Sequence, residues 1–348
     1  MPTRDRATGV DTTTGSRPER EIGVRSTVSK RLLGRGLLQG WELRSTVVYI
    51  SFIVLFLVFA VALRHDGFLT QTNLFNVVLQ AGTIAIMSCV YVLVLSAGEI
   101  DLSIGAIVPL SALVTASVLQ SHGFVVGSLA GVGTGLAVGG ATAFLVTVVG
   151  IPSFLVTLAM MAIVTGLARS INHLQTISVS NNTFVTYFGS GKIAGVSTLF
   201  LWMVLVAVAC TVAFHFARLG AHVRATGDNQ GVAAAVGIRV RRVRALVLIL
   251  SAVAAALAGM LYAGRIQSAS YTLGETDLLT VIAAVIIGGT SLFGGRGTVP
   301  GALVGSLLLA MLNNGLILAG LNVQQQSIAL GVLIIVAVIL GRDRQLSR

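Results

Sequence analysis

The sequence predicts an all-α integral membrane protein with about ten transmembrane helices, arranged as two pseudo-repeated halves with broken helices. Of the 348 residues, 55% are hydrophobic and only 10% are charged. A soluble protein of this length needs more charged residues to cover its surface. Long apolar runs recur along the chain, and two of them end in glycine-rich polar breaks. These observations together indicate a multi-pass membrane protein.

The chain is expected to comprise three parts. Residues 1–45 form a cytoplasmic tail rich in Arg, Thr, Ser and Gly, which we expect to be mostly disordered, with a candidate interfacial helix at 31–44. Residues 46–341 form the transmembrane domain, and residues 342–348 a cytoplasmic C-terminus. The first apolar run begins near Thr46. A secretory signal would start much earlier, so we expect no cleavable signal peptide.

Ten apolar runs have spanning or near-spanning length. A crossing needs about 20 apolar residues, so the shorter runs are expected to be tilted, broken or partly re-entrant. The runs are 46–63, 76–96, 104–119, 124–149, 153–168, 198–216, 245–263, 278–293, 299–318 and 326–341.

The basic residues predict the orientation of these spans. With both termini inside, 19 of the 23 Lys and Arg residues fall on the inner side and 4 on the outer side. Positive charge favours the cytoplasmic side of a membrane. We therefore expect both termini and the segment 217–244 in the cytoplasm and the polar segment 169–197 outside. Because the basic residues follow topology, they do not indicate a nucleic-acid partner.

The fourth apolar run carries a glycine at every fourth position. This spacing places the glycines on one helix face, where another backbone can approach closely. The stripe therefore predicts helix packing. Its members are Gly127, Gly131, Gly135 and Gly139.

Two pieces of the chain, 93–119 and 284–312, look alike. Each has an apolar run, a glycine-rich polar break and then an apolar helix that contains a proline, Pro109 or Pro300. Paired interruptions in corresponding halves are typical of a transport pathway built from broken helices.

The first break holds three candidate pathway residues, Glu99, Asp101 and Ser103. A carboxylate near the bilayer is costly unless it is solvated or paired, so it is a functional candidate. Alternatively, Asp101 or Ser103 caps the helix that starts at Ile104, and Glu99 faces cytoplasmic water.

Four further pathway candidates belong to the second break and the helix after it. Thr290 and Ser291 lie among glycines, where hydroxyls either bind a polar solute or form a rigid turn. Asn313 and Asn314 are adjacent amides in an apolar helix and need partners, either other helices or the solute.

Nothing in the sequence indicates catalysis or a bound cofactor. The GSGKI segment at 189–193 is not a phosphate-binding loop, because Thr186 stands where such a loop has glycine and Ile193 where it has Ser or Thr. The histidines have no metal-ligand spacing. Cys89 and Cys210 lie inside apolar runs and are expected to be free packing residues.

The segment 217–244 carries six arginines and one acid. Asn229 is a candidate N-cap for a short helix over GVAAAV, with Gly237 as the residue that ends it. The segment is either an ordinary solvated connector or a docking surface for a soluble partner.

Three stretches together resemble the permease subunits of ribose-type carbohydrate ABC importers. They are SAGEIDLSIGA at 96–106, ATGDNQGVAAAVGI at 225–238 and GGTSLFGGRGTVPGALVGSLLLAMLNNGL at 288–316. The sequence departs from the family pattern at Glu99, which replaces a usual glycine, at Asp228 and at Val232.

The resemblance, which covers about 46–341, implies an assembly. A second permease chain, identical or related, would complete the pathway, and a separate cytoplasmic ABC ATPase would bind the ATP and dock on 217–244. An extracytoplasmic binding protein would deliver a small sugar of the ribose or xylose type. The implied ATPase-coupling residues are Arg218, Arg224, Gly227, Asn229, Ala233, Gly237 and Ile238.

Two other functions fit the residues less fully. One is a permease for branched-chain amino acids or nucleosides in the same superfamily. The other is an ion-coupled secondary transporter that works without an ATPase. That transporter would need titratable groups, and Glu99 and Asp101 form the one close carboxylate pair available to it.

Overall fold

The computed structural model describes residues 48–171 and 173–342. The expected N-terminal tail and its interfacial helix lie outside the described residues, as do residues 343–348.

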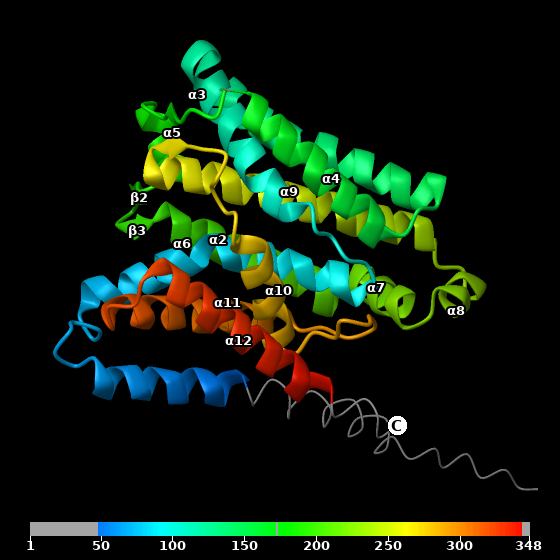
Figure 1. Cartoon of the computed structure of the whole chain (residues 1–348). Coiled ribbons are helices and arrows are strands. Elements are labelled where there is room, and N and C mark those ends of the chain that lie inside the picture. The colour runs from blue at the N-terminus through cyan, green and yellow to red at the C-terminus, as the bar shows by residue number, and fades with distance from the viewer. Residues whose placement is uncertain (1–47, 172, 343–348) are drawn as a thin grey trace, which may run out of the picture. The chain divides into compact units, whose positions relative to one another are not determined.

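The described part is almost entirely helical (Figure 1). Its long elements are Val48–Ala62, α2 (Gln71–Ser96), α3 (Ile104–Phe144), α4 (Ser153–Ser170), α6 (Thr198–Thr211), α9 (Val240–Ile266), α10 (Asp277–Ile287), α11 (Val299–Leu318) and α12 (Val323–Arg342). Short helices are α5 (Asn182–Phe188), α7 (Arg218–Asp228) and α8 (Gln230–Ala235), and the π-helical turns η1 (Leu145–Val149) and η2 (Val212–Phe216) extend α3 and α6.

Two short antiparallel strand pairs join loops between helices. β1 (Ile177–Ser178) pairs with β4 (Ser268–Ala269), and β2 (Lys192–Ile193) pairs with β3 (Val196–Ser197). The first pair ties the loop after α4 to the loop after α9, because Ile177 lies opposite Ala269.

Each of the ten predicted apolar runs falls largely within a helix, which confirms the all-α membrane class. Within the described residues, however, only six helices are long and apolar enough to cross a membrane. The third and fourth runs both lie within α3, as two helical segments that meet at Gly123, whose φ of 75° and ψ of −173° are not helical. The helices Val48–Ala62 and α10 are apolar but shorter than a full crossing.

The core lies around α2 and α9. Every residue of α2 from Ala81 to Ser96 is buried, and this helix contacts α6, α9, α10 and α11. A helix that is apolar all round belongs in an interior. Cys89 and Cys210 are buried free cysteines, as expected.

The glycine stripe of α3 packs on α9, as predicted. A Cβ atom on Gly135 would lie 2.8 Å from the carbonyl oxygen of Ala252. On Gly139 it would lie 3.0 Å from the Cα of Ile249. The two backbones therefore approach more closely than any larger residue at these positions allows.

Different elements gather at the two ends of α9. Short helices α7 and α8 lie beside its first turns, whereas α5 and the strands β2 and β3 lie toward its C-terminal end (Figure 1). These two ends contain the two regions that hold the candidate functional residues.

Candidate functional site

Three segments that are far apart in the sequence meet beside the start of α9. We call this region the junction: residues 96–103, 227–228 and 294–296. The backbone nitrogen of Gly295 donates to the carbonyl oxygen of Ser96 at 3.0 Å. A Cβ on Gly227 would lie 1.9 Å from that same oxygen. The junction therefore brings both glycine-rich breaks against the 217–244 segment.

An ion pair closes one side of the junction. Arg244 donates through Nε to Oε1 of Glu99 and through Nη2 to Oε2, the latter at 3.3 Å. Glu99 is only 2% exposed, so the expectation that it faces water is wrong. A buried carboxylate is stable when its oxygens are paired in this way. Sequence reasoning missed the partner because 145 residues separate the two.

Asp101 serves the local structure of the first break. Its Oδ1 accepts from the backbone nitrogen of Ser103 at 3.0 Å and from the Ser103 hydroxyl at 2.6 Å. The Tyr91 hydroxyl donates to the Asp101 carbonyl at 3.2 Å. Burial raises the pKa of the Asp101 carboxyl above its usual value. Ser103 precedes the first residue of α3, and its own side chain makes no capping bond.

The hydroxyls of the second break are bonded within a turn. The backbone nitrogen of Phe293 donates to the Ser291 hydroxyl at 3.2 Å, and that of Thr298 donates to the Thr290 hydroxyl at 3.4 Å. The backbone of Ser291 also donates to the Arg296 carbonyl at 3.1 Å. Of the two alternatives for these residues, the structure shows the turn.

The short helix in the 217–244 segment forms as predicted. The Asn229 side chain accepts from the backbone nitrogen of Val232 at 3.0 Å, which caps α8. At its other end Gly237 has φ 86°, and the Ile238 nitrogen donates to the Ala233 carbonyl at 3.0 Å. This is the Schellman arrangement that ends many helices.

The coupling residues suggested by resemblance mostly face the permease itself. Ala233 is buried, and Ile238 packs against the main core. Arg224 donates to the Phe214 carbonyl at 2.7 Å and lies over the ring of Phe214. Of this set, Arg218, Asn229 and Gly237 are exposed on the surface.

The exposed apolar residues of this region are different ones. Val232 lies in α8 and Val236 is the residue that follows its last turn; both are exposed, and Val236 is 71% exposed. Phe293, in the turn beside the junction, is 78% exposed. Sequence reasoning treated Val232 only as a departure from the family pattern. The signal that it missed is the spacing of the two valines, four residues apart on one helix face.

A polar cavity of about 340 Å³ lies toward the opposite ends of the same helices. Its wall comes from α2, α9, α10, α11 and α12. The polar side chains that carry its character are Gln80, Tyr262, Arg265, Asp277, Asn313 and Gln326. Of the predicted pathway candidates, Asn313 alone lines this cavity.

The neighbouring amide, Asn314, has a structural partner instead. Its Nδ2 donates to Oδ1 of Asn73 at 2.9 Å, and the Asn73 amide returns a bond at 3.0 Å. This reciprocal pair joins α2 to α11. Sequence reasoning left both roles open for both asparagines, and the structure separates them because adjacent helical residues face different directions.

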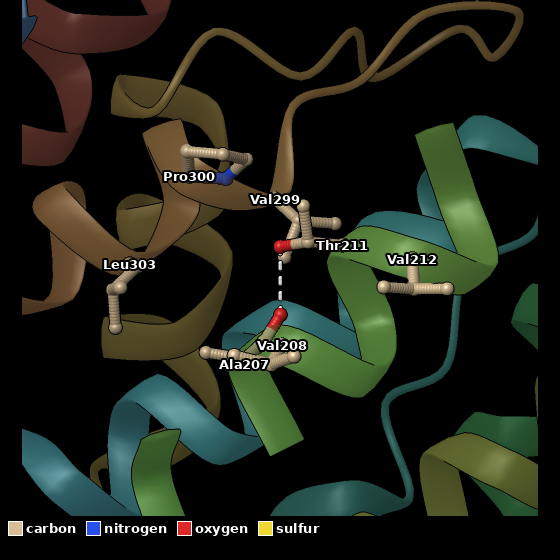
Figure 2. Close-up of a pocket in the computed structure, with 7 residues that line it drawn as sticks. All are labelled: Ala207, Val208, Thr211, Val212, Val299, Pro300 and Leu303. Atoms are coloured by element: carbon tan, nitrogen blue, oxygen red, sulfur yellow. Dashed lines mark hydrogen bonds between the residues drawn. The ribbon is translucent and has the colours of Figure 1, made fainter. Parts of the chain in front are cut away.

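A second cavity, of about 220 Å³, lies between α6 and α11 and is apolar. Figure 2 shows its seven lining residues, in which the hydroxyl of Thr211 donates back to the Ala207 carbonyl at 2.7 Å. No other lining residue has a side-chain donor or acceptor. This cavity therefore has no free polar group for a polar solute.

Comparison with known proteins decides the family. Residues 73–338 match the family described as branched-chain amino acid transport system / permease component. The chain belongs to this family. No solved structure matches this permease.

Several curated relatives of the permease are named as importer subunits. It is 35% identical to the ribose import permease protein RbsC of Escherichia coli K12 over 84% of its own length and 92% of the relative's. It is also 35% identical to RbsC of Bacillus subtilis, over 83% of its own length and 90% of the relative's. It is 33% identical to the D-allose transport system permease protein AlsC of E. coli K12, over 84% of its own length and 91% of the relative's.

Proposed function

We propose that this permease is the membrane subunit of an ATP-driven importer for a small sugar of the ribose or xylose type. Relatives aligned over more than four-fifths of the chain are named for ribose or D-allose transport. Other relatives, at 32% identity, are named as ABC transporter permeases. The chemistry of ATP hydrolysis then belongs to a separate subunit, and this chain binds no cofactor of its own.

The proposed topology has ten crossings with both termini in the cytoplasm of a bacterium. The six long apolar helices supply seven of them when α3 is divided at its Gly123 kink. The helix Val48–Ala62, α10 and α12 supply the other three. The excess of basic residues in the tail and in 217–244 supports this orientation in the inner membrane. It places the junction on the cytoplasmic side and the polar cavity toward the outer side.

A cytoplasmic ABC ATPase is the proposed partner at α8. Val232, Val236 and Phe293 expose apolar side chains, and Arg239, Arg241 and Arg242 are exposed close by. An exposed apolar patch with a polar rim is typical of a protein interface.

One observation carries the coupling role. The end of α7 is in close contact with both breaks, since a Cβ on Gly227 would lie 1.9 Å from the carbonyl oxygen of Ser96 and 2.7 Å from the backbone nitrogen of Gly295. Asn229 then begins α8 directly after α7. A displacement of α8 would therefore be transmitted to the end of α2 and to the turn between α10 and α11, because the backbones there are in close contact and closely packed interiors have low compressibility. This is what an ATPase-driven change of access requires.

Two further partners complete the proposal. A second permease chain, identical or related, forms the pathway with this one, and an extracytoplasmic sugar-binding protein delivers the solute. Both follow from membership in a family of transport-system components.

The docking surface is tested by placing a charge on it. Val236→Glu places an exposed carboxylate at the C-terminal end of α8, where the side chain does not contact the core. We expect the purified permease to remain folded but to lose co-purification with its ATPase. The matched control is Val196→Glu, an exposed valine in the short strand β3 at the other end of the molecule. Full ATPase binding by Val236→Glu would contradict the assignment.

A second candidate function is supported by the family description, which names branched-chain amino acids. Vesicles that contain the complete importer distinguish the two. ATP-driven accumulation of D-ribose supports the sugar assignment, whereas accumulation of L-leucine or uridine in its place supports the alternative.

A further inference from the structure

We propose that the polar cavity is a binding site for an uncharged, polyhydroxylated solute, with Asn313 and Asp277 as its principal hydrogen-bonding residues. The inference rests on the proposed function and adds to it the place within one chain where the solute binds.

Two amide side chains that line the cavity, Gln80 and Asn313, have no side-chain partner among the described residues. Asn314, in contrast, is paired with Asn73. An amide offers both donors and acceptors. A sugar hydroxyl needs both, so two unpaired amides in one cavity suit a polyol.

The charged groups of the cavity are already placed against protein groups. Arg265 donates to the Leu79 carbonyl at 3.3 Å. Asp277 is 8% exposed and faces the hydroxyl of Tyr262, and its Oδ2 accepts no hydrogen bond from a described residue. One guanidinium and one carboxylate leave the cavity with no net charge from these side chains. Asp277 lines the cavity, and a carboxylate forms strong, charge-assisted hydrogen bonds with a solute hydroxyl that reaches it.

The size and the apolar wall fit the same class of ligand. A volume of about 340 Å³ lies at the lower end of small-molecule pockets. Ile84, Leu309 and the ring of Tyr262 provide apolar surface beside the polar groups. Such surface complements the C–H faces of a sugar ring. The apolar cavity between α6 and α11 lacks this combination.

The cavity is connected to the junction by two helices. Asp277 is the first residue of α10, and α10 ends at Ile287, just before the turn that holds Thr290. Asn313 lies in α11, which begins at Val299, just after that turn. A movement of the junction would therefore shift both principal residues of the cavity. Along α2, Gln80 and Ser96 are separated by about 24 Å at the usual helical rise.

The test is protection of an introduced cysteine. Ala310→Cys places a thiol at the cavity wall and leaves Asn313 and Asp277 intact, and the native Cys89 and Cys210 are buried, which keeps background labelling low. The full permease in proteoliposomes is treated with a membrane-impermeant thiol reagent, with and without D-ribose. At ten times the dissociation constant, we expect labelling to slow about elevenfold. Tyr187→Cys, exposed outside the cavity, is the control and should label at the same rate throughout.

A second variant tests the site without labelling. Asp277→Asn in the complete importer should lower ribose uptake about tenfold, because a charge-assisted hydrogen bond is lost. It should keep ATPase stimulation by the loaded binding protein, and Thr211→Val, in the apolar cavity, should transport normally.

Three outcomes overturn the inference. They are labelling of Ala310→Cys that ribose does not slow, protection of Ala310→Cys by L-leucine in place of ribose, and normal uptake by Asp277→Asn. If the wild-type importer fails to accumulate ribose with ATP, the proposed function fails. If it accumulates ribose, but ribose gives no protection from labelling and Asp277→Asn transports normally, only the cavity assignment fails.

Discussion

Arg244 binds the carboxylate of Glu99 with two nitrogens, Nε and Nη2. Glu99 lies in the turn between α2 and α3, and Arg244, the last residue of the 217–244 segment, lies in the second turn of α9. The pair therefore ties the first break to the helix that follows α8.

The two partners of this pair should not be equivalent. Arg244→Ala leaves a buried carboxylate without a partner and should cost about 3 kcal/mol of stability. Glu99→Gly leaves an arginine that is 19% exposed and can reach water, so it should cost about 1 kcal/mol or less. Thermal unfolding in detergent measures both. Equal losses would contradict the predicted difference, and no loss in either variant would show that the pair does not stabilise the junction.

The glycine stripe predicts a position-specific packing defect. Gly135→Leu would force a side chain into the Ala252 backbone and should destabilise the α3–α9 contact by more than about 3 kcal/mol. Gly133→Leu, two residues away, has no atom within 4 Å of its added Cβ and should be tolerated. Size-exclusion profiles in detergent compare the two. Aggregation of both variants, or of neither, is the contrary result.

Gly227 should tolerate no side chain at the junction. Gly227→Ala places a Cβ 1.9 Å from the Ser96 oxygen, so α7 must move away from the first break. We expect a loss of about 1–3 kcal/mol and reduced coupling of ATPase activity to transport. In Gly231→Ala the nearest atom is the Asn229 side-chain oxygen at 3.3 Å, and the substitution should be neutral or stabilising in a helix. Unchanged coupling in Gly227→Ala would argue against the junction.

Asp101 should matter through its hydrogen bonds rather than through its charge. Asp101→Asn keeps an oxygen for the Ser103 nitrogen and hydroxyl, so ribose uptake should remain within about twofold of the wild type. Asp101→Ala leaves both groups of Ser103 without that acceptor and should cost about 1–3 kcal/mol. Uptake and thermal unfolding are measured together. Loss of uptake in a stable Asp101→Asn would restore a direct role in the pathway.

Local signals in the sequence predicted local structure well. Asn229 and Gly237 cap a short helix as expected, because capping depends on residues only a few positions apart. The stripe through Gly135 and Gly139 predicted close helix packing for the same reason. The all-α membrane class followed from the composition together with the long apolar runs.

Relationships between distant residues could not be predicted in the same way. The sequence contains nothing that pairs Glu99 with Arg244, or that turns Asn313 toward a cavity and Asn314 toward Asn73. The cavity takes residues from five helices, and its composition depends on how each helix is rotated. Two expected spans also meet within α3 without a loop between them, because Gly123, whose φ is 75°, turns the chain between two helical segments.

The central claim, that ATP drives sugar import through this permease, is tested most directly by solute accumulation in vesicles. The permease is reconstituted with its ATPase, and the loaded binding protein is added outside. We predict that D-ribose accumulates with ATP inside, that it does not accumulate with ADP, and that collapsing proton and sodium gradients has no effect. Accumulation that needs an ion gradient and proceeds without ATP would contradict the account.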